Sequence, residues 1–270
     1  MDEGFIRLGF FLGVFVAVAL WEQSQPRRSL MESRKVRWFS NLAIAFLNTI
    51  LLRLAFPILT VGIAVLCEDK GWGLLNNVEM PYPIKVFCAV LFLDFAIYMQ
   101  HVVVHAVPLL WRLHLMHHTD LDFDVTTGSR FHPIEIIISM MIKIFVVVAL
   151  GASEIAVIIF EVLLNATSMF NHGNINIPIK IDCFVRLFLV TPDMHRVHHS
   201  FKPKETNSNF GFNLPWWDRL FGTYRDQPEE GHSGMTIGIS QFRDSKYLKL
   251  RWLLIQPFVS DSGEYPINRR

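Results

Sequence analysis

The chain contains several apolar segments that are long enough to cross a lipid bilayer. A helix needs roughly 20 apolar residues to span the hydrocarbon core. Four or five segments approach that length, and they are Gly4–Trp21, Asn41–Cys67, Lys85–Leu110, Pro133–Leu150 and Ser153–Phe170. With 51% hydrophobic and only 18% charged residues, the chain is too apolar for an ordinary soluble domain. We therefore predict an all-α integral-membrane helical bundle.

Single residues and short stretches of the sequence predict further details of this bundle. Pro57 lies inside the second segment and is expected to kink it. Gly151-Ala152 leaves only a tight turn between the last two segments, which predicts an antiparallel helical hairpin. After Asn174 the sequence turns polar, so we expect a cap on the bundle. Near its end, Asp244–Phe258 is either a helix in the membrane interface or an amphipathic helix packed on the cap.

The distribution of basic residues predicts which way the bundle faces. Five basic residues lie between the first two apolar segments: Arg27, Arg28, Arg34, Lys35 and Arg37. The next loop, residues 68–85, has only two. Because basic loops stay in the cytoplasm, the first loop, the end of the third segment and the cap are all expected on the cytoplasmic side.

Three boxes of histidines are the main chemical signal. They read HVVVH, HLMHH and HRVHH, and their histidines are His101, His105, His114, His117, His118, His195, His198 and His199. Residues three and four apart share a helix face, and imidazole is a common ligand of transition metals. Eight histidines exceed the four ligands of one tetrahedral ion. The simplest interpretation is a pair of metal ions.

Other polar side chains fall on the same helix faces. Asp94 lies in line with the first box, and a carboxylate at membrane depth is a functional hypothesis by default. We expect Asp94 to accept a hydrogen bond from a ligand imidazole. Glu161, Asn165 and Ser168 lead at helical spacing to His172, which is either a further ligand or a structural histidine. For Glu161 and Asn165, a hydrogen-bonded pair between helices is the alternative.

More residues near the boxes are candidates to orient ligand imidazoles. These are Asp120, His132, Asn171 and Asn174. A capping role is equally open for His132, because it precedes the proline that starts a helix. Asp122 and Asp124 follow Asp120, and for at least two of the three we expect a solvated acidic loop. His232 is isolated, and we expect it at the surface.

Charge and cysteine content exclude other classes of protein. The net charge is +1, which gives no reason to expect a nucleic-acid partner. Cys67, Cys88 and Cys183 are far apart and form no CxxC pair. We interpret them as buried thiols, not as a disulfide framework or a zinc site.

The boxes and their surroundings resemble the fatty acid hydroxylase / sterol desaturase superfamily. The likeness covers roughly Lys85–Pro228 and includes "HHTDLDFDVTTGSRFHPIE", "FNHGN", "TPDMHRVHHS" and "TNSNFGFNLPWWDRLFGTYRD". It is nearest to bacterial sterol-desaturase-like proteins and the alkylglycerol monooxygenases, which favours a bacterial inner membrane over the endoplasmic reticulum. Residues 1–80 would form N-terminal membrane helices, 81–228 the catalytic domain and 229–270 a tail.

The resemblance implies an O2-dependent lipid hydroxylase with two iron ions. Matched motif by motif, the eight box histidines and His172 would be the iron ligands. Some relatives carry another histidine four residues before that one, where this chain has Ser168. Water or His132 would then complete the set. Zinc is expected to replace iron in some isolated samples, because imidazoles bind it well.

The resemblance also implies partners. The substrate would be a membrane lipid such as a sterol, a fatty acyl chain or a glyceryl ether. Electrons would come from an external donor of the cytochrome b5, ferredoxin or reductase type. Candidate docking residues on the cap are Arg196, Lys202, Lys204 and Arg225, although a basic face near anionic lipid is an equal alternative.

Three other functions compete with hydroxylation. A lipid desaturase would use the same ligands, so the boxes cannot separate the two. A metal transporter would place its ligands along a path through the membrane, whereas these boxes cluster at one face. A zinc hydrolase would need fewer ligands, an open position and a nearby carboxylate base.

Overall fold

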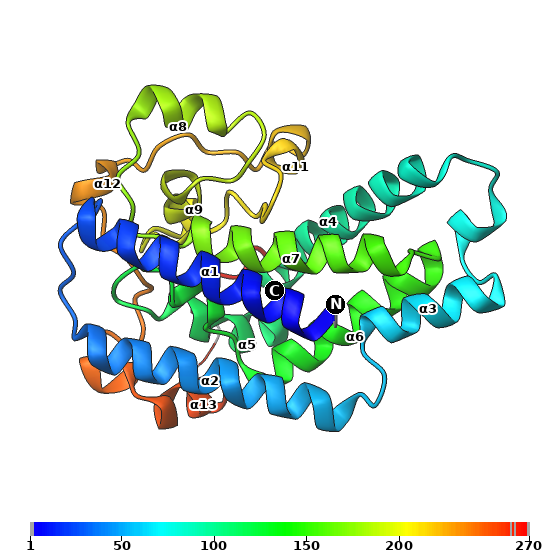
Figure 1. The fold of residues 1–270 in the computed structure, drawn as a ribbon. Coiled ribbons are helices and arrows are strands. Elements are labelled where there is room, and N and C mark those ends of the chain that lie inside the picture. The colour runs from blue at the N-terminus through cyan, green and yellow to red at the C-terminus, as the bar shows by residue number, and fades with distance from the viewer. Residues whose placement is uncertain (1–2, 260, 262, 269–270) are drawn as a thin grey trace.

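The computed structural model describes residues 3–259, 261 and 263–268, in which the regular structure consists of helices and two isolated β-bridges. The description leaves out residues 1–2, at the start of the expected membrane region 1–80, and residues 269–270, at the end of the expected tail 229–270. The helices run alongside one another, with a smaller lobe at one end (Figure 1). Five stretches are long and apolar enough to cross a membrane: Gly4–Ser24, Arg34–Asn77, Tyr82–Ala106, Pro133–Leu150 and Glu154–Asn171. The predicted all-α membrane bundle is confirmed.

The second apolar segment forms two helices where a single kinked helix was predicted. α2 (Arg34–Ala55) ends at Phe56, whose backbone is extended, and α3 (Thr60–Lys70) begins after Leu59. Pro57 disfavours the helical conformation in the residue before it and offers no N–H to the helix. These two restrictions together are enough to end one helix and start another.

The predicted helical hairpin is present. α6 (Pro133–Leu150) and α7 (Glu154–Asn171) are joined through Gly151, which has a positive φ of 66° and donates its N–H to the carbonyl of Val147 at 2.9 Å. A Cβ on Gly73, in the loop that follows α3, would lie 2.0 Å from the nitrogen of Gly151. Two chain turns therefore meet at this end of the bundle, where only glycine fits. The short helix η1 (Leu74–Asn77) also lies there.

α4 (Tyr82–Ala106) and α5 (Pro108–His118) bring the first two histidine boxes together. Val107 is extended between them, because the proline after it excludes helix there. α4 packs against α5, α6 and α7. Its buried face carries the four residues that the spacing predicts there, which are Asp94, Tyr98, His101 and His105.

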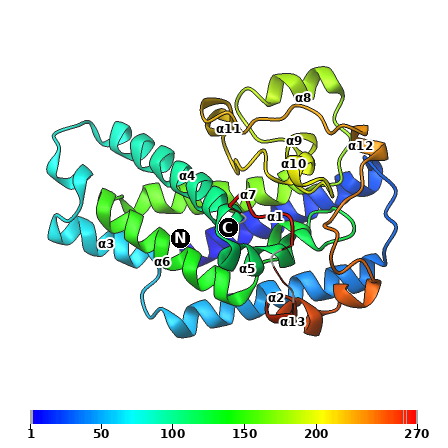
Figure 2. The ribbon, with the colours of Figure 1, turned by 180° about the vertical axis from the view of Figure 1, so that it is seen from behind.

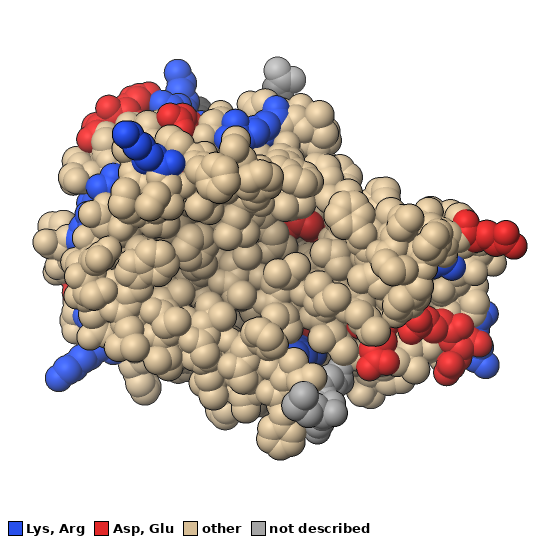
Figure 3. All heavy atoms as spheres, turned by 45° about the horizontal axis from the view of Figure 1, so that its top comes forward, with Lys and Arg blue, Asp and Glu red and all other residues tan. Residues whose placement is uncertain are grey.

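The outside of the bundle is apolar. α1 (Glu3–Ser24) packs along α7, while its outer face exposes large side chains such as Phe5, which is 74% exposed. α2 likewise exposes large apolar side chains, among them Phe46 and Leu54. Figure 3 shows a broad surface with few charged side chains between two charged ends. This pattern and the five apolar stretches identify a multi-pass membrane protein.

A cap of short helices covers one end of the bundle, as expected (Figures 1 and 2). Its helices are α8 (Ile179–Val185), α9 (Pro192–His198), α10 (Pro203–Thr206), α11 (Trp216–Leu220) and α12 (Gly231–Gly234). The third histidine box lies on α9 and continues one residue beyond it.

The loop between α1 and α2 is bound to this cap by backbone and side-chain contacts. The N–H of Arg27 donates to the carbonyl of Asn174 at 2.9 Å, and its guanidinium contacts Asp193 at 3.1 Å. Arg28 Nη1 donates to the carbonyl of Met235 at 2.7 Å. The basic residues that predict orientation therefore also hold the cap in place.

The C-terminal segment packs against the bundle. η3 (Ser245–Leu248) leads into α13 (Leu250–Val259), which contacts α2 and α5. Leu253 of α13 is fully buried with Ile44 of α2 and Met116 of α5. The segment is therefore helical and packs on α2 and α5 and not on the cap, while its place in the membrane interface stays a prediction.

Candidate metal centre

The nine histidines singled out by the sequence meet in one buried region. They form two groups, and within each group one ring nitrogen of every member lies within 4.8 Å of the others. The first group consists of His101, His105, His114, His118 and His198, and the second of His117, His172, His195 and His199. None of the nine is more than 3% exposed.

Helical spacing explains how interleaved boxes build two neighbouring groups. In the HLMHH box, His114 and His118 lie four residues apart and join the first group, while His117 points to the second. The HRVHH box does the reverse, since its middle histidine, His198, joins the first group and its other two join the second. These two boxes therefore contribute to both groups and keep them adjacent.

The two groups differ by one histidine. His101 and His105 add a pair from α4 to the first group, whereas the second receives only His172. Ser168 lies one turn before His172 and makes other bonds: its hydroxyl donates to the carbonyl of Gly128 at 3.1 Å, and its own carbonyl accepts from His172 Nδ1 at 2.7 Å. The second group therefore has four described imidazoles where the first has five.

His132 does not supply the missing nitrogen. Its Nδ1 accepts a hydrogen bond from the N–H of Ile134, which caps α6, and its Nε2 faces the carbonyl of Leu254 at 3.3 Å. His132 belongs to neither group. Of the three roles considered for it, helix capping is the one observed.

Main-chain carbonyls fix which nitrogen of several rings carries the proton. His101 Nδ1 lies 2.7 Å from the carbonyl of Phe210, and His198 Nδ1 lies 2.8 Å from that of Ser208. His172 Nδ1 has its own carbonyl partner, described above. A carbonyl only accepts, so each Nδ1 must donate, and the Nε2 of a neutral ring then offers a lone pair.

Two further rings are held by side chains that sequence reasoning missed. His114 Nδ1 lies 2.6 Å from Glu135 Oε1, and His105 Nδ1 lies 3.1 Å from Asn207 Oδ1. A lone carboxylate in the first turn of a largely apolar helix is a signal that would have found Glu135. Asn207 carries no comparable signal, since asparagine is common in polar loops.

The inward nitrogens approach one another closely. The Nε2 atoms of His105 and His118 are 3.2 Å apart, those of His117 and His172 are 3.2 Å apart, and those of His172 and His195 are 3.1 Å apart. Two nitrogens that bind one ion at about 2.1 Å lie about 3.0–3.4 Å from each other. Within the two groups, the Nε2 atoms of His101, His114, His198 and His199 are buried without a hydrogen-bond partner.

Burial keeps these rings neutral. It lowers the pKa of His117, His118, His195, His198 and His199 well below the ordinary value, and neighbouring imidazoles lower it further. Burial likewise lowers the pKa of His172 to about 4. Neutral imidazole is the form that binds a metal.

The donor set therefore fits metal ions. Buried lone pairs without partners are costly, and a cation at the centre of each group would satisfy them together. Nitrogen-only donors suit iron, zinc, copper and nickel. No carboxylate of the described residues joins either group.

The expected orienting residues mostly contact other partners. Asp94 was predicted to accept from an imidazole, but its Oδ2 accepts from Trp217 Nε1 at 2.8 Å and so joins α4 to α11. Asn171 Nδ2 donates to the carbonyl of Phe212 at 3.1 Å. Asn174 holds the loop between α1 and α2. These side chains support the centre by fixing its surroundings.

The acidic loop after the second box is not solvated, contrary to expectation. Asp120, Asp122 and Asp124 are all buried. Arg37 Nε contacts Asp120 Oδ1 at 2.7 Å, and its Nη1 contacts Asp124 Oδ2 at 2.5 Å. Burial alone would raise the pKa of Asp120, but Arg37 and Arg130 lower it to about 2. The loop is a buried ion network directly behind the HLMHH box.

Three further surface assignments were wrong. Arg196 was a candidate docking residue, but it is fully buried and pairs with Asp193. His232 was expected at the surface and is 4% exposed, 3.5 Å from Asp193. The cysteines were expected to be buried, and only Cys67 is: Cys88 is partly exposed and Cys183 is exposed.

An all-α membrane bundle that buries nine imidazoles at its capped end defines a class of histidine-rich membrane metalloprotein. The chain belongs to the fatty acid hydroxylase family, whose model matches residues 86–223. The superfamily resemblance seen in the boxes is confirmed. The family is iron-dependent, and the chain is an oxidoreductase of this family.

Curated relatives include hydroxylases, a monooxygenase and a desaturase. The ornithine lipid hydroxylase OlsE of Rhizobium tropici is 26% identical over 85% of this chain and 70% of its own length. Human alkylglycerol monooxygenase is 27% identical over 64% of this chain but only 38% of its own length. The Delta(7)-sterol-C5(6)-desaturase of Nicotiana tabacum is 28% identical over 60% of this chain and 55% of its own. No solved structure matches the chain.

Proposed function

We propose that this protein hydroxylates a C–H bond of a membrane lipid, with O2 as co-substrate and two iron ions at the histidine centre. The observation that carries the proposal is the pair of adjacent all-imidazole groups. In such a reaction one oxygen atom enters the C–H bond, and two external electrons and two protons reduce the other oxygen atom to water.

One iron would be held by the first group and one by the second. The ligands would be His101, His105, His114, His118 and His198 for one ion, and His117, His172, His195 and His199 for the other. The ions would activate O2, which is the oxidant that an aliphatic C–H bond requires. Water would fill the place that Ser168 leaves in the second group.

The protein's own side chains would orient these ligands and exclude water. Nδ1 partners hold several rings with Nε2 inward. Phe131 stacks on His117 at 4.6 Å between ring centroids, and Phe210 lies edge-on to His101 at 5.4 Å. An apolar lining of this kind protects a reactive centre from solvent.

We propose that residues 81–228 form the catalytic domain, with residues 1–80 as membrane helices and 229–270 as a tail. The metal centre would face the cytoplasm, in a bacterial inner membrane. The basic loop between α1 and α2 lies at the capped end, which supports this orientation. The lipid tail would enter from the bilayer, and its position would decide which carbon reacts.

An external donor of the cytochrome b5, ferredoxin or reductase type would supply the electrons. The expected docking residues give this donor little free charge. Lys202 pairs with Glu229 at 2.9 Å and Arg225 with the same residue at 3.0 Å, which leaves Lys204 without an ion pair among the described residues. The basic residues of the cap therefore do not identify the binding site of the electron donor.

Desaturation is the second candidate. The likeness to the tobacco sterol desaturase favours it, and the same ligands would serve both reactions. It removes two hydrogens from neighbouring carbons and forms two waters from O2 with the same two electrons.

The test compares lipids of cells with and without the gene, with iron supplied. A gain of one oxygen in a lipid supports hydroxylation, and a loss of two hydrogens supports the alternative. The purified protein should hold close to two iron ions per chain, and finding none after gentle purification would contradict the proposal.

Three substitutions sharpen this test. His198→Asn removes a member of the first group and His117→Asn one of the second, so both should abolish the lipid product and lower the iron content. His132→Asn is the control, since asparagine can still cap α6. Full turnover by either of the first two variants would remove that residue from the ligand set.

A further inference from the structure

Two segments of the cap expose large apolar side chains. One is the second half of α8 with the residues that follow it, and the other is α11. The exposed side chains, which we call the cap patch, are each between 42% and 70% exposed: Phe184, Leu187, Phe188, Trp216, Leu220 and Phe221. A contiguous apolar surface of this kind marks contact with another molecule or with a membrane.

The polarity of α8 is the reverse of that of a helix on a water-facing surface. Asp182 and Arg186 are buried and pair with each other at 2.5 Å. Phe184 and Phe188 are exposed instead, with their ring centroids 5.9 Å apart. A water-facing helix would bury its aromatic side chains and expose its charged ones. The arrangement of α8 is the one expected where hydrocarbon lies outside.

α11 has the same reversed polarity. Asp218 is buried and accepts hydrogen bonds from two main-chain N–H groups at 2.8 and 2.9 Å. The guanidinium of Arg219 lies over the ring of Tyr224 at 4.1 Å, so this charge is partly covered. Trp216 is exposed, and its Nε1 donates to the carbonyl of Leu187 at 2.6 Å. This bond joins α11 to the end of α8 and makes the cap patch one surface.

The depth of the cap patch follows from the contacts of α11 with α4. Asp94, which accepts from Trp217, lies halfway along the 25 residues of α4, and α4 is one of the five apolar stretches that can cross a membrane. Phe221 of the patch stacks on Tyr98, one turn farther along, at 5.7 Å between ring centroids. Figures 1 and 2 both show α11 on the side of the cap that is nearest to α4. The cap patch therefore lies beside a membrane helix, near its middle.

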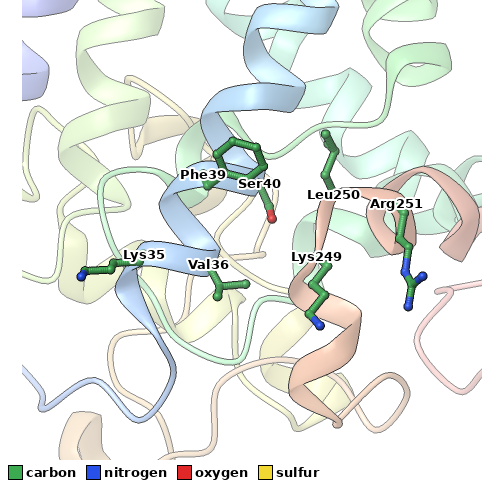
Figure 4. Close-up of a pocket in the computed structure, with 7 residues that line it drawn as sticks. All are labelled: Lys35, Val36, Phe39, Ser40, Lys249, Leu250 and Arg251. Carbon is green, nitrogen blue, oxygen red and sulfur yellow. The ribbon is translucent and has the colours of Figure 1, made fainter.

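The start of α2, on the other side of the bundle, shows what the charged level of this end looks like. A hollow of about 460 Å³ lies between α2 and α13, and Lys35 and Arg251 point away from it on opposite sides (Figure 4). Basic side chains that extend outwards in this way are typical of the level where water meets a membrane. Phe39, one turn farther along α2, is already 71% exposed. On α2 the change from charged to apolar surface therefore takes about one turn.

We propose that the cap patch is inserted into the bilayer leaflet next to the cap, so that α8 and α11 anchor the cap in lipid. The patch extends the apolar outer surface of the bundle onto the cap, and its side chains would lie among the acyl chains near the headgroups. Trp216 would lie at the boundary, where amphipathic indoles are favoured. Ile179 and Cys183, nearer the start of α8, would remain on the water side.

Spin labels on single cysteines test this placement. Each cysteine is introduced into full-length C67S/C88S/C183S protein, which is reconstituted with iron into phosphatidylcholine nanodiscs. Accessibility to O2, which concentrates in hydrocarbon, is compared with accessibility to a water-soluble nickel chelate. Labels at L187C and L220C should give the high O2-to-nickel ratio of F46C on the lipid-facing side of α2. Their ratio should exceed several-fold that of M31C, in the exposed loop between α1 and α2.

A second position on the same helix is the matched control. Ile179 is 55% exposed and Leu187 is 47% exposed, so exposure alone does not distinguish them. I179C should nevertheless resemble M31C, because it lies at the opposite end of α8. High nickel accessibility at L187C and L220C would overturn the proposal. Low accessibility of both labels to both reagents would show a protein partner or a second copy on the patch, and would also overturn it.

A further measurement needs no cysteine substitution. Bromine on acyl chains quenches tryptophans that touch lipid. In nanodiscs of brominated phosphatidylcholine, the quenched fraction of native fluorescence should exceed that of W216F, because the variant loses an indole that lipid reaches. An equal or larger quenched fraction in W216F would contradict the insertion.

These measurements do not depend on the proposed reaction, because none of them detects product. Iron content and the melting temperature show whether each variant has folded. A failure of the lipid hydroxylation test would therefore leave the placement of the cap patch unchanged, and a water-exposed patch would leave the proposed reaction unchanged.

Discussion

Five of the nine imidazoles of the centre are positioned by a hydrogen-bond partner behind the ring. Carbonyl groups hold three of the rings, Asn207 holds one, and Glu135 holds His114. The carboxylate differs from the others because it places a negative charge beside its ring, which strengthens the binding of a cation. At the scale of single residues, the outer partners thus decide both where the lone pairs point and how strongly they bind.

Glu135→Gln should lower the metal affinity of the first group. The amide can still accept from His114 Nδ1, but it no longer carries the negative charge, and loss of such a partner typically costs about 10–100-fold in affinity. Iron retained during dialysis against a graded chelator measures the effect. Glu154→Gln, an exposed acid at the start of α7, is the control. Equal retention by both variants would make Glu135 a purely structural residue.

Arg37→Met should destabilise the protein strongly. Arg37 is fully buried against Asp120 and Asp124, and removing one partner of a buried ion pair costs about 3–5 kcal/mol. The melting temperature in detergent measures the change. The exposed Arg53 provides the comparison, since Arg53→Met should have little effect. Similar melting temperatures for the two variants would show that the network contributes little.

Sequence could identify the histidines but not what holds them. Nine imidazoles at helical spacing have no common explanation other than metal, so the set could be found without coordinates. The carbonyls of Phe210 and Ser208 leave no trace in a sequence, because every residue has one. Arg196 and the aspartates looked solvated because charge usually is. Only the fold shows that Arg196 pairs with Asp193 and that Asp120 and Asp124 pair with Arg37.

At the scale of elements, proline and glycine decide where helices end. Pro57 divides one apolar segment into α2 and α3, and Pro108 turns α5 away from α4. Hydropathy predicted the spans, because it measures the total length of apolar chain. It could not choose between a kink and a break at Pro57, because that depends on whether the freed backbone groups find partners after packing.

Gly151→Ala should destabilise the hairpin turn. Gly151 has a φ of +66°, and its added Cβ would lie 2.4 Å from the carbonyl oxygen of Trp72. A strained left-handed residue alone costs about 1–2 kcal/mol, and the collision adds to that. Gly13→Ala, within α1, makes the same chemical change where no atom lies within 4 Å, and it should stabilise the helix slightly. Thermal unfolding of both variants would reveal the opposite signs, and a matching sign would refute the argument.

At the scale of the whole molecule, the buried histidines make the fold sensitive to acid. The folded-state pKa values of His117, His195 and His199 lie below the ordinary value of 6.5, and that of His172 is about 4. The unfolded chain therefore binds protons first as the pH falls. Stability is full above about pH 6.5 and is lost as the pH falls towards the folded values, by at most about 1.4 kcal/mol per pH unit for each histidine.

We expect the melting temperature of the metal-free protein to fall steeply between pH 7 and pH 5, and to change little between pH 7 and pH 8. Metal-loaded protein should melt higher at pH 7 and lose that advantage in acid, because protons compete for the ligand nitrogens. A melting temperature that stays constant down to pH 5 would mean that the rings are not buried as a neutral cluster.

The sidedness of the cap can be tested with a native thiol. Cys183 is exposed on α8, Cys67 is buried, and Cys88 is only partly exposed on a membrane helix. A maleimide that cannot cross membranes should label Cys183 in inverted vesicles and not in intact cells. Cys183→Ser should abolish that labelling. Labelling in intact cells would reverse the proposed orientation.

The arginines of the loop between α1 and α2, together with Arg37 in the first turn of α2, act both during membrane insertion and in the folded protein. While the chain is being inserted, only their charge matters, and lysine would serve as well. Once it is folded, Arg28 reaches a main-chain carbonyl of the cap and Arg37 grips two aspartates in a forked geometry that lysine cannot copy. Replacing Arg27, Arg28 and Arg37 by lysine should thus leave the membrane orientation of the chain unchanged. The cap over the histidines should nevertheless lose its contacts with these side chains and pack incompletely on the bundle.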